Sequence, residues 1–583
     1  MFAIACPARA GRMDIPAPQG SHRFGTGVTA LPNGNFVVTD PGFSEPGGTG
    51  AIGAVYLYDG RTLQLISRLT GGSAGDQVGA EGITVVSGGN YVVHSPHWKN
   101  GGLTEAGAVT WCSGTTGRTG VVSAANSLVG GAANTRIGSR RGSAESGNII
   151  VLSSGNYLLC TPDWHDGTAE EMGALTWCRS DGTVTGVISA ANSLTGSSPE
   201  DRVGRKDSIT LLPDGNFLTY SYFWDNGGAV NAGALTWGSG VSPTVGAVSA
   251  ATSLVGSATD DHVGESVIVL SSGNYLVASS GWDDGSIVDA GALTWGSAAG
   301  GVRGVVSAEN SVVGSSIRSG VGRSTGVFLL ANGNFVASEP FWSKGAVPTA
   351  RGAVRWCSGT SGATGPLTEE NSLTGGRQLD QVGDVYPLPN GNYVVASPSW
   401  DNGASEDVGA VTWCDGARGT VGVVSPENSL TGFAAGDAVG SAGIVLLTNG
   451  NFVVCSPDWR NTRGAVTFMA AGAPVRGIVS ASNSLIGGRD MDGVGAGTLQ
   501  PWTEGRYVIP LSNGNYVVGS PWWDNGAAID AGAVTWGSGT EGVKGLVSAG
   551  NSLVGGTAGD RLGVRNWDLG SGSGIVALDT GHY

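Results

Sequence analysis

The sequence predicts an all-β fold, a β-propeller of about nine four-stranded blades. A hairpin signal of the Asn-Gly type returns about every 60 residues, a spacing typical of a repeated structural unit. Each period holds four short β-rich segments separated by turn residues. Glycine accounts for 103 of 583 residues, and long helices are not expected because each helical glycine costs about 1 kcal/mol relative to alanine.

The repeat is clearest in residues 388–403, which read Leu-Pro-Asn-Gly-Asn-Tyr-Val-Val-Ala-Ser-Pro-Ser-Trp-Asp-Asn-Gly. Asn390 and Gly391 lie between apolar segments, where this dipeptide favours a two-residue hairpin because both positions need positive φ. The Asn that precedes a Tyr or Phe marks nine copies: Asn35, Asn90, Asn156, Asn216, Asn274, Asn334, Asn392, Asn451 and Asn515.

In the seventh repeat we expect strands at residues 384–388, 392–397, 410–414 and 421–425. If these strands form a meander A to D, the A–B and C–D turns share one edge of the sheet. The B–C loops and the crossings from D to the next A share the other edge. Because the longer loops collect there, this rim is the expected binding surface. A stacked β-solenoid is the competing architecture, although its coils are usually shorter.

We expect a tail at residues 1–23 and a single propeller domain of nine repeats at residues 24–583. The repeats must pack on one another, since one blade cannot bury its own faces. Residues 565–569 and 574–579 look like the first two strands of a tenth repeat. They predict a closing segment, which either exchanges strands with the first repeat or packs outside a nine-bladed ring.

Three segments, Gly53–Tyr58, Gly75–Gly79 and Tyr91–Pro96, give the sequence a familiar pattern. It resembles the FG-GAP repeat of integrin-α-type propellers. It is also similar to the repeats of large bacterial surface proteins of the filamentous-haemagglutinin kind. The resemblance implies a propeller with an adhesive or scaffolding role, placed outside the cell or at its surface.

One feature of FG-GAP repeats is missing, the acidic calcium loop Asp-x-Asp-x-Asp-Gly. Its place is taken by a minimal hairpin such as residues 213–216, Pro-Asp-Gly-Asn. Calcium needs about 6–8 oxygen ligands, which a two-residue turn cannot supply. We therefore expect no bound metal and no cofactor.

The candidate binding residues are a tryptophan in each B–C loop and the aspartate that often follows it. An aromatic face beside carboxylate groups suits a sugar, whose C–H face stacks while its hydroxyls form hydrogen bonds. The alternative is that the tryptophans pack between blades and the aspartates close Asx turns. The candidates are Trp98, Trp164, Trp224, Asp225, Trp282, Asp283, Trp342, Trp400, Asp401, Trp459, Trp523 and Asp524.

The rival functional class is an enzyme of the glycoside hydrolase or lyase type, with one site near the ring centre. The sequence contains no His-Glu-x-x-His and no phosphate loop, and no catalytic residues are predicted. His94, His97, Lys99 and His165 depart from the repeat pattern on the predicted rim, and they are the place to look for an anion or metal.

The composition limits the partners. Only 13% of residues are charged and the net charge is −16, which disfavours nucleic acid as a partner. No apolar run is long enough for a membrane span, and the N-terminus lacks a basic region before an apolar core. We expect a non-enzymatic binding, adhesion or scaffold protein that recognises a glycan or a surface protein.

The seven cysteines are an odd number, so they cannot all pair within the chain. Most of them occupy two equivalent positions of different repeats, where they are unlikely to come within disulfide range. We expect them to act as small buried hydrophobic residues.

Overall fold

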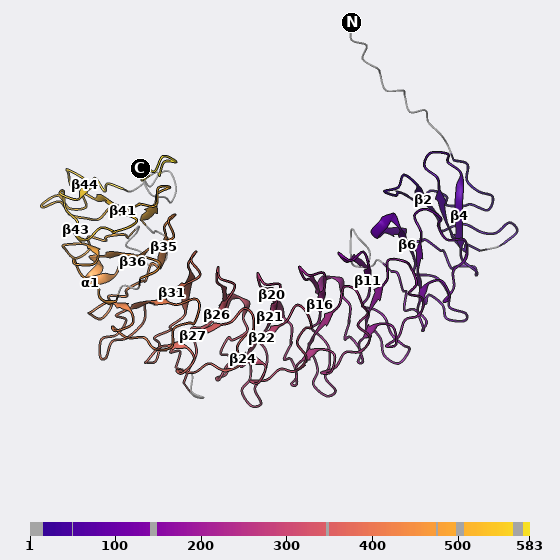
Figure 1. Cartoon of the computed structure of the whole chain (residues 1–583), viewed down its shortest axis with the longest axis horizontal. Helices are drawn as coiled ribbons and strands as arrows, with labels where there is room; N and C mark the ends of the chain where they lie inside the picture. The colour runs from indigo at the N-terminus through magenta and orange to yellow at the C-terminus, as the bar shows by residue number, and fades with distance from the viewer. Residues whose placement is uncertain are drawn as a thin grey trace, which may run out of the picture. The chain divides into compact units, whose positions relative to one another are not determined.

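The computed structural model describes residues 15–48, 50–139, 148–344, 349–473, 476–496, 507–563, 575 and 577–583. Figure 1 shows a chain made almost entirely of short strands and turns, which confirms the all-β prediction. The chain divides into two compact units, Met1–Gly264 with Ala298–Val305, and Glu265–Ser297 with Val306–Tyr583. No helix in the described residues is long and apolar enough to cross a membrane.

Each repeat supplies four antiparallel strands, A to D, to its own sheet. The A strands are β1 (Gly27–Ala30), β5 (Ile83–Val85), β10 (Ile149–Val151), β15 (Ile209–Leu211), β20 (Ser266–Val269), β25 (Val327–Leu329), β30 (Asp384–Pro387), β35 (Ile444–Leu446) and β40 (Val508–Pro510). The B strands are β2 (Phe36–Asp40), β6 (Tyr91–Ser95), β11 (Tyr157–Thr161), β16 (Phe217–Ser221), β21 (Tyr275–Ser279), β26 (Phe335–Glu339), β31 (Tyr393–Ser397), β36 (Phe452–Ser456) and β41 (Tyr516–Ser520).

The C strands follow the B–C loops, and the D strands close each repeat's own contribution. The C strands are β3 (Ala54–Tyr58), β7 (Ala108–Cys112), β12 (Ala174–Cys178), β17 (Ala234–Gly238), β22 (Ala292–Gly296), β27 (Ala353–Cys357), β32 (Ala410–Cys414), β37 (Ala465–Met469) and β42 (Ala533–Gly537). The D strands are β4 (Leu65–Thr70), β9 (Leu128–Val129), β14 (Leu194–Thr195), β19 (Leu254–Val255), β24 (Ser311–Val313), β29 (Leu373–Thr374), β34 (Leu430–Thr431), β39 (Leu485–Ile486) and β44 (Ser552–Val554).

A fifth, two-residue strand precedes D in the chain and pairs in parallel with the D strand of the preceding repeat. These strands are β8 (Gly120–Val121), β13 (Gly186–Val187), β18 (Gly246–Ala247), β23 (Gly304–Val305), β28 (Gly365–Pro366), β33 (Gly422–Val423), β38 (Gly477–Ile478) and β43 (Gly545–Leu546). The helical turns of the described residues are η1 (Ser87–Gly89), η2 (Lys206–Ser208), η3 (Ser324–Gly326) and α1 (Trp459–Thr462).

The prediction of four-stranded sheets is therefore wrong for most repeats. The described residues form eight five-stranded sheets and one four-stranded sheet, and none of them closes on itself. In the seventh repeat, the segment predicted as the fourth strand is β33, which joins the sheet of the sixth repeat through Leu373↔Gly422 and Thr374↔Val423. The true fourth strand is β34, which was predicted as part of the crossing. A two-residue strand is too short to show an alternation of apolar and polar residues in the sequence. A strand that pairs with another repeat is also not marked by the residues next to it.

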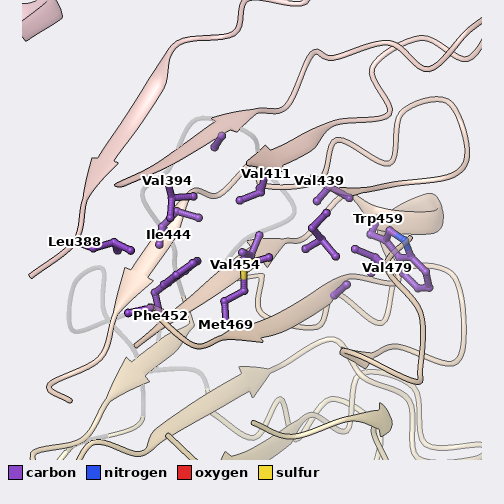
Figure 2. Close-up of a cluster of buried hydrophobic side chains, with 14 of the residues drawn as sticks. Leu388, Val394, Val411, Val439, Ile444, Phe452, Val454, Trp459, Met469 and Val479 are labelled. Atoms are coloured by element: carbon purple, nitrogen blue, oxygen red, sulfur yellow. The ribbon is translucent and has the colours of Figure 1, made fainter. Parts of the chain in front are cut away.

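The hydrophobic core lies between consecutive sheets. Figure 2 shows one such cluster, in which Leu388, Val394 and Val411 of the seventh repeat pack with Phe452 and Val454 of the eighth. The B strands β31 and β36 are buried along their whole length. A strand that is covered on both faces reads as a continuous apolar run, which is why these segments lack alternation.

The outer face of the first sheet is covered by residues from the start of the chain. Phe24 contacts Tyr56 edge-on at 5.6 Å between ring centroids, and Phe36 stacks on Tyr58 at 5.4 Å. Ile15 packs against the same cluster. Part of the predicted tail at 1–23 therefore packs against the first sheet.

The predicted closing segment is only partly within the described residues. Residues 565–569, 574 and 576 lie outside them. The last residues form a turn in which Leu578 N donates to His582 O at 2.8 Å. Asn513 Nδ2 donates to Gly581 O at 3.0 Å, so this turn contacts the ninth repeat.

The six cysteines of the described residues are all buried, as expected for small hydrophobic residues: Cys112, Cys160, Cys178, Cys357, Cys414 and Cys455. Burial raises the pKa of the Cys112 and Cys357 thiols to about 12. A thiol that stays protonated in a packed interior is a poor nucleophile.

Candidate functional site

The B–C loops and the crossings meet at one edge of the sheets, here called the loop edge, as the sequence predicts. A buried aspartate holds them together. Asp437 Oδ2 accepts hydrogen bonds from the N–H groups of Phe433 and Ala434 at 2.8 and 2.9 Å, within its own crossing. Its Oδ1 accepts from Arg460 N at 2.9 Å, in the loop of the next repeat. One carboxylate therefore joins two repeats.

The same bond recurs along the chain. The aspartate of one crossing accepts from the backbone N–H that follows the loop tryptophan of the next repeat in these pairs: Asp76 and Lys99, Asp201 and Asp225, Asp380 and Asp401, Asp492 and Asp524. The aspartate-capped turn was expected from the sequence, but the link to the next repeat was not. The donor is a backbone N–H group, which any residue supplies, so the link has no side-chain signal of its own in the next repeat.

The predicted loop aspartates each close their own loop. Asp225 Oδ1 accepts from Asn231 N at 2.8 Å, and Asp401 Oδ1 accepts from Asp407 N at 2.9 Å. Asp283 and Asp524 make the corresponding bonds to Asp289 N and Asp530 N at 2.8 and 2.9 Å. One oxygen of each is thus committed to the loop, and the side chains are half-buried.

The eight predicted loop tryptophans lie beneath this edge rather than on it. Their exposed fractions run from 2% for Trp342 to 7% for Trp523. Each one described in a core cluster packs between two sheets, as Trp98, Trp164, Trp224, Trp400 and Trp459 do. Trp282 is 3% exposed. The rings are therefore covered, and a ligand at this edge would meet the loop backbone and the exposed residues around them.

The opposite edge carries the A–B and C–D turns, also as predicted. Gly416 O, in the C–D turn of the seventh repeat, accepts from three groups of the sixth. They are Asn332 Nδ2 at 2.7 Å, Asn334 Nδ2 at 3.1 Å and Trp356 Nε1 at 2.8 Å. The second tryptophan links neighbouring repeats in the same way at Trp177, Trp237, Trp295 and Trp413.

Three of the four residues of the rival hypothesis, His94, His97 and Lys99, make structural contacts, and His165 is half-buried in the loop of the third repeat. His94 is fully buried, and its Nε2 lies 2.8 Å from Thr84 Oγ1. His97 Nδ1 lies 3.2 Å from Glu105 Oε1, and Lys99 Nζ donates to Ala74 O. Within the described part of the chain, no group of three or more His, Cys, Asp or Glu side chains could hold a metal ion.

Two junctions lack the aspartate of the crossing. Between the second and third repeats Thr135 takes its place, and Thr135 Oγ1 donates to Ala106 O at 2.9 Å. The other is the junction between the fifth and sixth repeats. Ser319 and Gly320 stand where the seventh repeat has Asp437 and Ala438. Glu339 ends strand β26 at a position where the other repeats have a smaller side chain. Those residues are Asp40, Ser95, Thr161, Ser221, Ser279, Ser397, Ser456 and Ser520. A comparison of the repeats position by position would have found Glu339, but the site predictions rested on what the repeats share.

This junction contains a pocket of about 520 Å³ on the loop edge, here called the Glu339 pocket. Its charged lining residues are Arg318, Arg323, Glu339 and Asp384, and its aromatic ones are Phe328, Phe341 and Tyr386. They come from the crossing, from the sixth repeat and from the start of the seventh. The volume is within the range of about 300–1,000 Å³ that small-molecule sites occupy.

Glu339 is only 2% exposed although it lines the pocket. Its Oε1 accepts a hydrogen bond from Phe341 N at 3.0 Å. Burial raises the pKa of the Glu339 carboxyl to about 8, against the opposing effects of the Phe341 N–H and the charge of Arg323. A carboxyl group with such a pKa holds its proton at neutral pH and can donate it or release it.

Comparison with protein families identifies the repeat. A family described as a repeat of unknown function, DUF5650, matches eight segments that together make up more than half of the chain: 85–139, 151–205, 211–265, 269–323, 329–384, 387–441, 446–496 and 510–564. The chain belongs to the DUF5650 family. The DUF5650 segments correspond to the second to ninth sheets, and the first repeat forms the same kind of sheet outside them.

The other comparisons add little to this assignment. No curated protein matches the chain. Among solved structures, one described as "Streptogramin B lyase structure" is 8% identical, over 64% of this chain and 88% of that chain, with a TM-score of 0.21. A similarity of that size carries no argument about function.

Proposed function

We propose that this DUF5650 protein is a non-enzymatic binding or scaffold protein that recognises a glycan or a surface protein with its loop edge. The observation that supports this proposal is the recurrence of one loop geometry. The aspartate bond between crossing and loop is repeated in pair after pair of repeats. Such an edge presents the same weak binding site several times, and several weak sites on one chain together bind a repetitive partner with high avidity.

The contacts would come from exposed residues of the loops, since the tryptophans beneath them are covered. Val230, Glu406 and Ile529 occupy one equivalent position, six residues after the loop tryptophan, and all three are exposed. Val230 is 49% and Ile529 62% exposed. Exposed apolar groups on a polar rim are typical of a contact surface.

A matched pair of variants tests the proposal. The loop variant carries Val230→Ser, Glu406→Ser and Ile529→Ser. The control variant carries Val241→Ser, Arg418→Ser and Glu541→Ser, three exposed positions in the C–D turns of the other edge. Both should unfold like the parent chain, since exposed substitutions away from caps change stability by roughly 0.5 kcal/mol or less.

Binding is measured on a glycan array and on intact cells of the source organism. We expect binding of the parent chain to one of them, lost in the loop variant and kept in the control variant. Equal loss in both variants would place the contact elsewhere, and no binding on either support would contradict the proposal.

The location outside the cell or at its surface is part of the same proposal. It is supported by the resemblance to FG-GAP and filamentous-haemagglutinin-like repeats. Fractionation of the source organism with a tagged full-length chain tests it, and a chain found wholly in the cytosol would overturn it.

Closure of the sheets into a propeller ring is also a proposal. Packing of consecutive sheets face to face supports it. Small-angle X-ray scattering provides the test, because a compact body of this length has a radius of gyration of about 25 Å. A much larger radius would contradict a closed ring.

A further inference from the structure

The Glu339 pocket results from linked changes at one junction. Ser319 replaces the aspartate of the crossing, and its Oγ donates to Ala290 O at 2.7 Å instead of joining the next loop. Ser343 replaces the loop aspartate, and its Oγ accepts from Thr349 N at 2.6 Å. This junction therefore lacks both the crossing aspartate and the loop aspartate found at other junctions. Its carboxylate is instead that of Glu339, which lines the pocket.

Gly320 makes room for this side chain. A Cβ atom on Gly320 would lie 2.5 Å from Glu339 Oε2, which is closer than two such atoms can approach. The backbone there has φ +82°, and the equivalent residues in other repeats also have positive φ, for example Gln381 at 46° and Ala438 at 41°. Those residues nevertheless carry a side chain. Gly320 is therefore fitted to Glu339 rather than to the turn alone.

The two oxygens of Glu339 have different surroundings. Oε1 accepts from Phe341 N, as described above. Oε2 lies beside Gly320, at the place where a Cβ atom on that residue would come within 2.5 Å. A positively charged group at Oε2 would take the place of the carboxyl proton, and the nearby rings of Phe328, Phe341 and Tyr386 suit an ammonium or its apolar neighbour.

Positive charge also lines this pocket. Arg318 and Arg323 belong to the crossing and line the pocket, and both are exposed. Arg318 Nε lies 3.5 Å from Asp289 Oδ2 with 79% of its side chain exposed, so this ion pair is weak. The two guanidinium groups are free to bind a carboxylate, for which their planar donor geometry is well matched.

We propose that the Glu339 pocket binds a small zwitterion of the amino-acid type. Its ammonium group is bound by Glu339, its carboxylate by Arg318 and Arg323, and its side chain by the aromatic walls. The buried acid gives specificity, because only a ligand with a positively charged amine can take the place of the Glu339 proton. This inference is independent of the loop-edge proposal, since it uses one junction rather than the repeated loops.

Three probes on the parent chain separate the two charges: L-phenylalanine, phenethylamine without the carboxylate, and 3-phenylpropionate without the amine. Isothermal titration calorimetry should show phenylalanine binding at least tenfold more tightly than either analogue. Repeating the titration in buffers of different ionisation enthalpy should show release of about one proton at pH 7, because Glu339 loses its proton to bind the amine. Asp384 also lines the pocket, and burial raises the pKa of its carboxyl, so the Glu339→Gln variant is needed to assign the released proton.

Two variants assign the charges to residues. Glu339→Gln keeps the shape and should weaken phenylalanine and phenethylamine at least tenfold while leaving 3-phenylpropionate unchanged and abolishing proton release. Arg318→Gln with Arg323→Gln should weaken phenylalanine and 3-phenylpropionate and spare phenethylamine. The proposal fails if none of the probes binds at millimolar concentration, if 3-phenylpropionate binds as tightly as phenylalanine, or if Glu339→Gln binds phenylalanine like the parent.

Discussion

The junction between the seventh and eighth repeats and the junction between the fifth and sixth repeats are built from the same strands and loops. Each contains a buried carboxylate, but the two carboxylates have different contacts. Between the seventh and eighth repeats, Asp437 accepts three backbone N–H bonds and joins the two repeats. Between the fifth and sixth, Glu339 accepts one backbone bond and borders a pocket. A buried charge is costly unless its bonds are satisfied. The first carboxylate therefore serves the fold, and the second keeps a binding capacity that the fold does not use.

The comparison shows where function should be sought in a repeat protein. What every repeat shares is needed for stacking, as the buried loop tryptophans and the Asp437-type bonds illustrate. What one repeat alone has, and what its neighbours have adapted to accommodate, is the better candidate for chemistry.

The largest loss of stability is expected from removing the buried loop tryptophan, and it should be about the same at both junctions. Trp459→Ala and Trp342→Ala each remove a ring that is at most 6% exposed and should each destabilise the local structure by about 3–5 kcal/mol. Hydrogen exchange of the amides of β36 and β26 measures this locally, which matters because a repeat protein need not unfold in one step. If amide exchange is unchanged in both variants, the two tryptophans do not stabilise the packing, and a role in ligand binding becomes the better explanation for them.

The second largest effect is a pH dependence of stability, which is expected at the Glu339 junction and not at the Asp437 junction. The folded-state pKa of Glu339 is raised from 4.5 to about 8, so folding favours the protonated acid. The stability linked to this group is fully present below pH 4.5 and is lost as the pH rises to about 8. Glu339→Gln should therefore match the parent near pH 4 and exceed it by roughly 3–5 kcal/mol near pH 9.

Unfolding midpoints and exchange of β26 amides across this range measure the difference. Ser456→Ala at the ordinary junction is the control and should show no such pH dependence. A Glu339→Gln variant whose difference from the parent is the same at pH 4 and pH 9 would mean that the acid is not buried in the folded protein.

A smaller effect follows from giving the ordinary junction the residue of the exceptional one. Asp437→Ser removes the acceptor of three backbone N–H groups and should cost about 2–3 kcal/mol, since serine can replace only part of these bonds. The amides of Phe433, Ala434 and Arg460 should exchange faster, while those of β26 should not change. Slow exchange of all three would show that the carboxylate is dispensable.

Much of this fold was readable from the sequence for a physical reason. Asn-Gly turns and apolar runs are local signals, so strands A, B and C were placed close to their true positions, as β31 and β32 show. The tight turns and long loops were assigned to the right edges because a meander alternates its ends. The parallel strand β33 and the short strand β34 were exchanged, since their pairing depends on a neighbouring repeat.

The site was harder to read than the fold. The tryptophans were conspicuous because they recur, and recurrence reflects stacking at least as much as binding. Glu339 was overlooked because one glutamate among 46 acidic residues has no local signal. Its meaning depends on Gly320, which is close to it only after the fifth and sixth repeats have packed.

The smallest effect concerns the turn edge, where the two junctions also differ. Trp356 Nε1 in the sixth repeat donates to Gly416 O at 2.8 Å, whereas the eighth repeat has Phe468 at the equivalent position. Trp356→Phe keeps most of the packing and removes one hydrogen bond, so a loss of about 1 kcal/mol is expected. Gly416 O still accepts from Asn332 and Asn334, and this limits the loss. Adding Asn332→Ala to Trp356→Phe should cost more than the sum of the two single changes, because the carbonyl then loses two of its three donors. A double-mutant cycle measures this coupling, and strict additivity would show that the donors to Gly416 act independently.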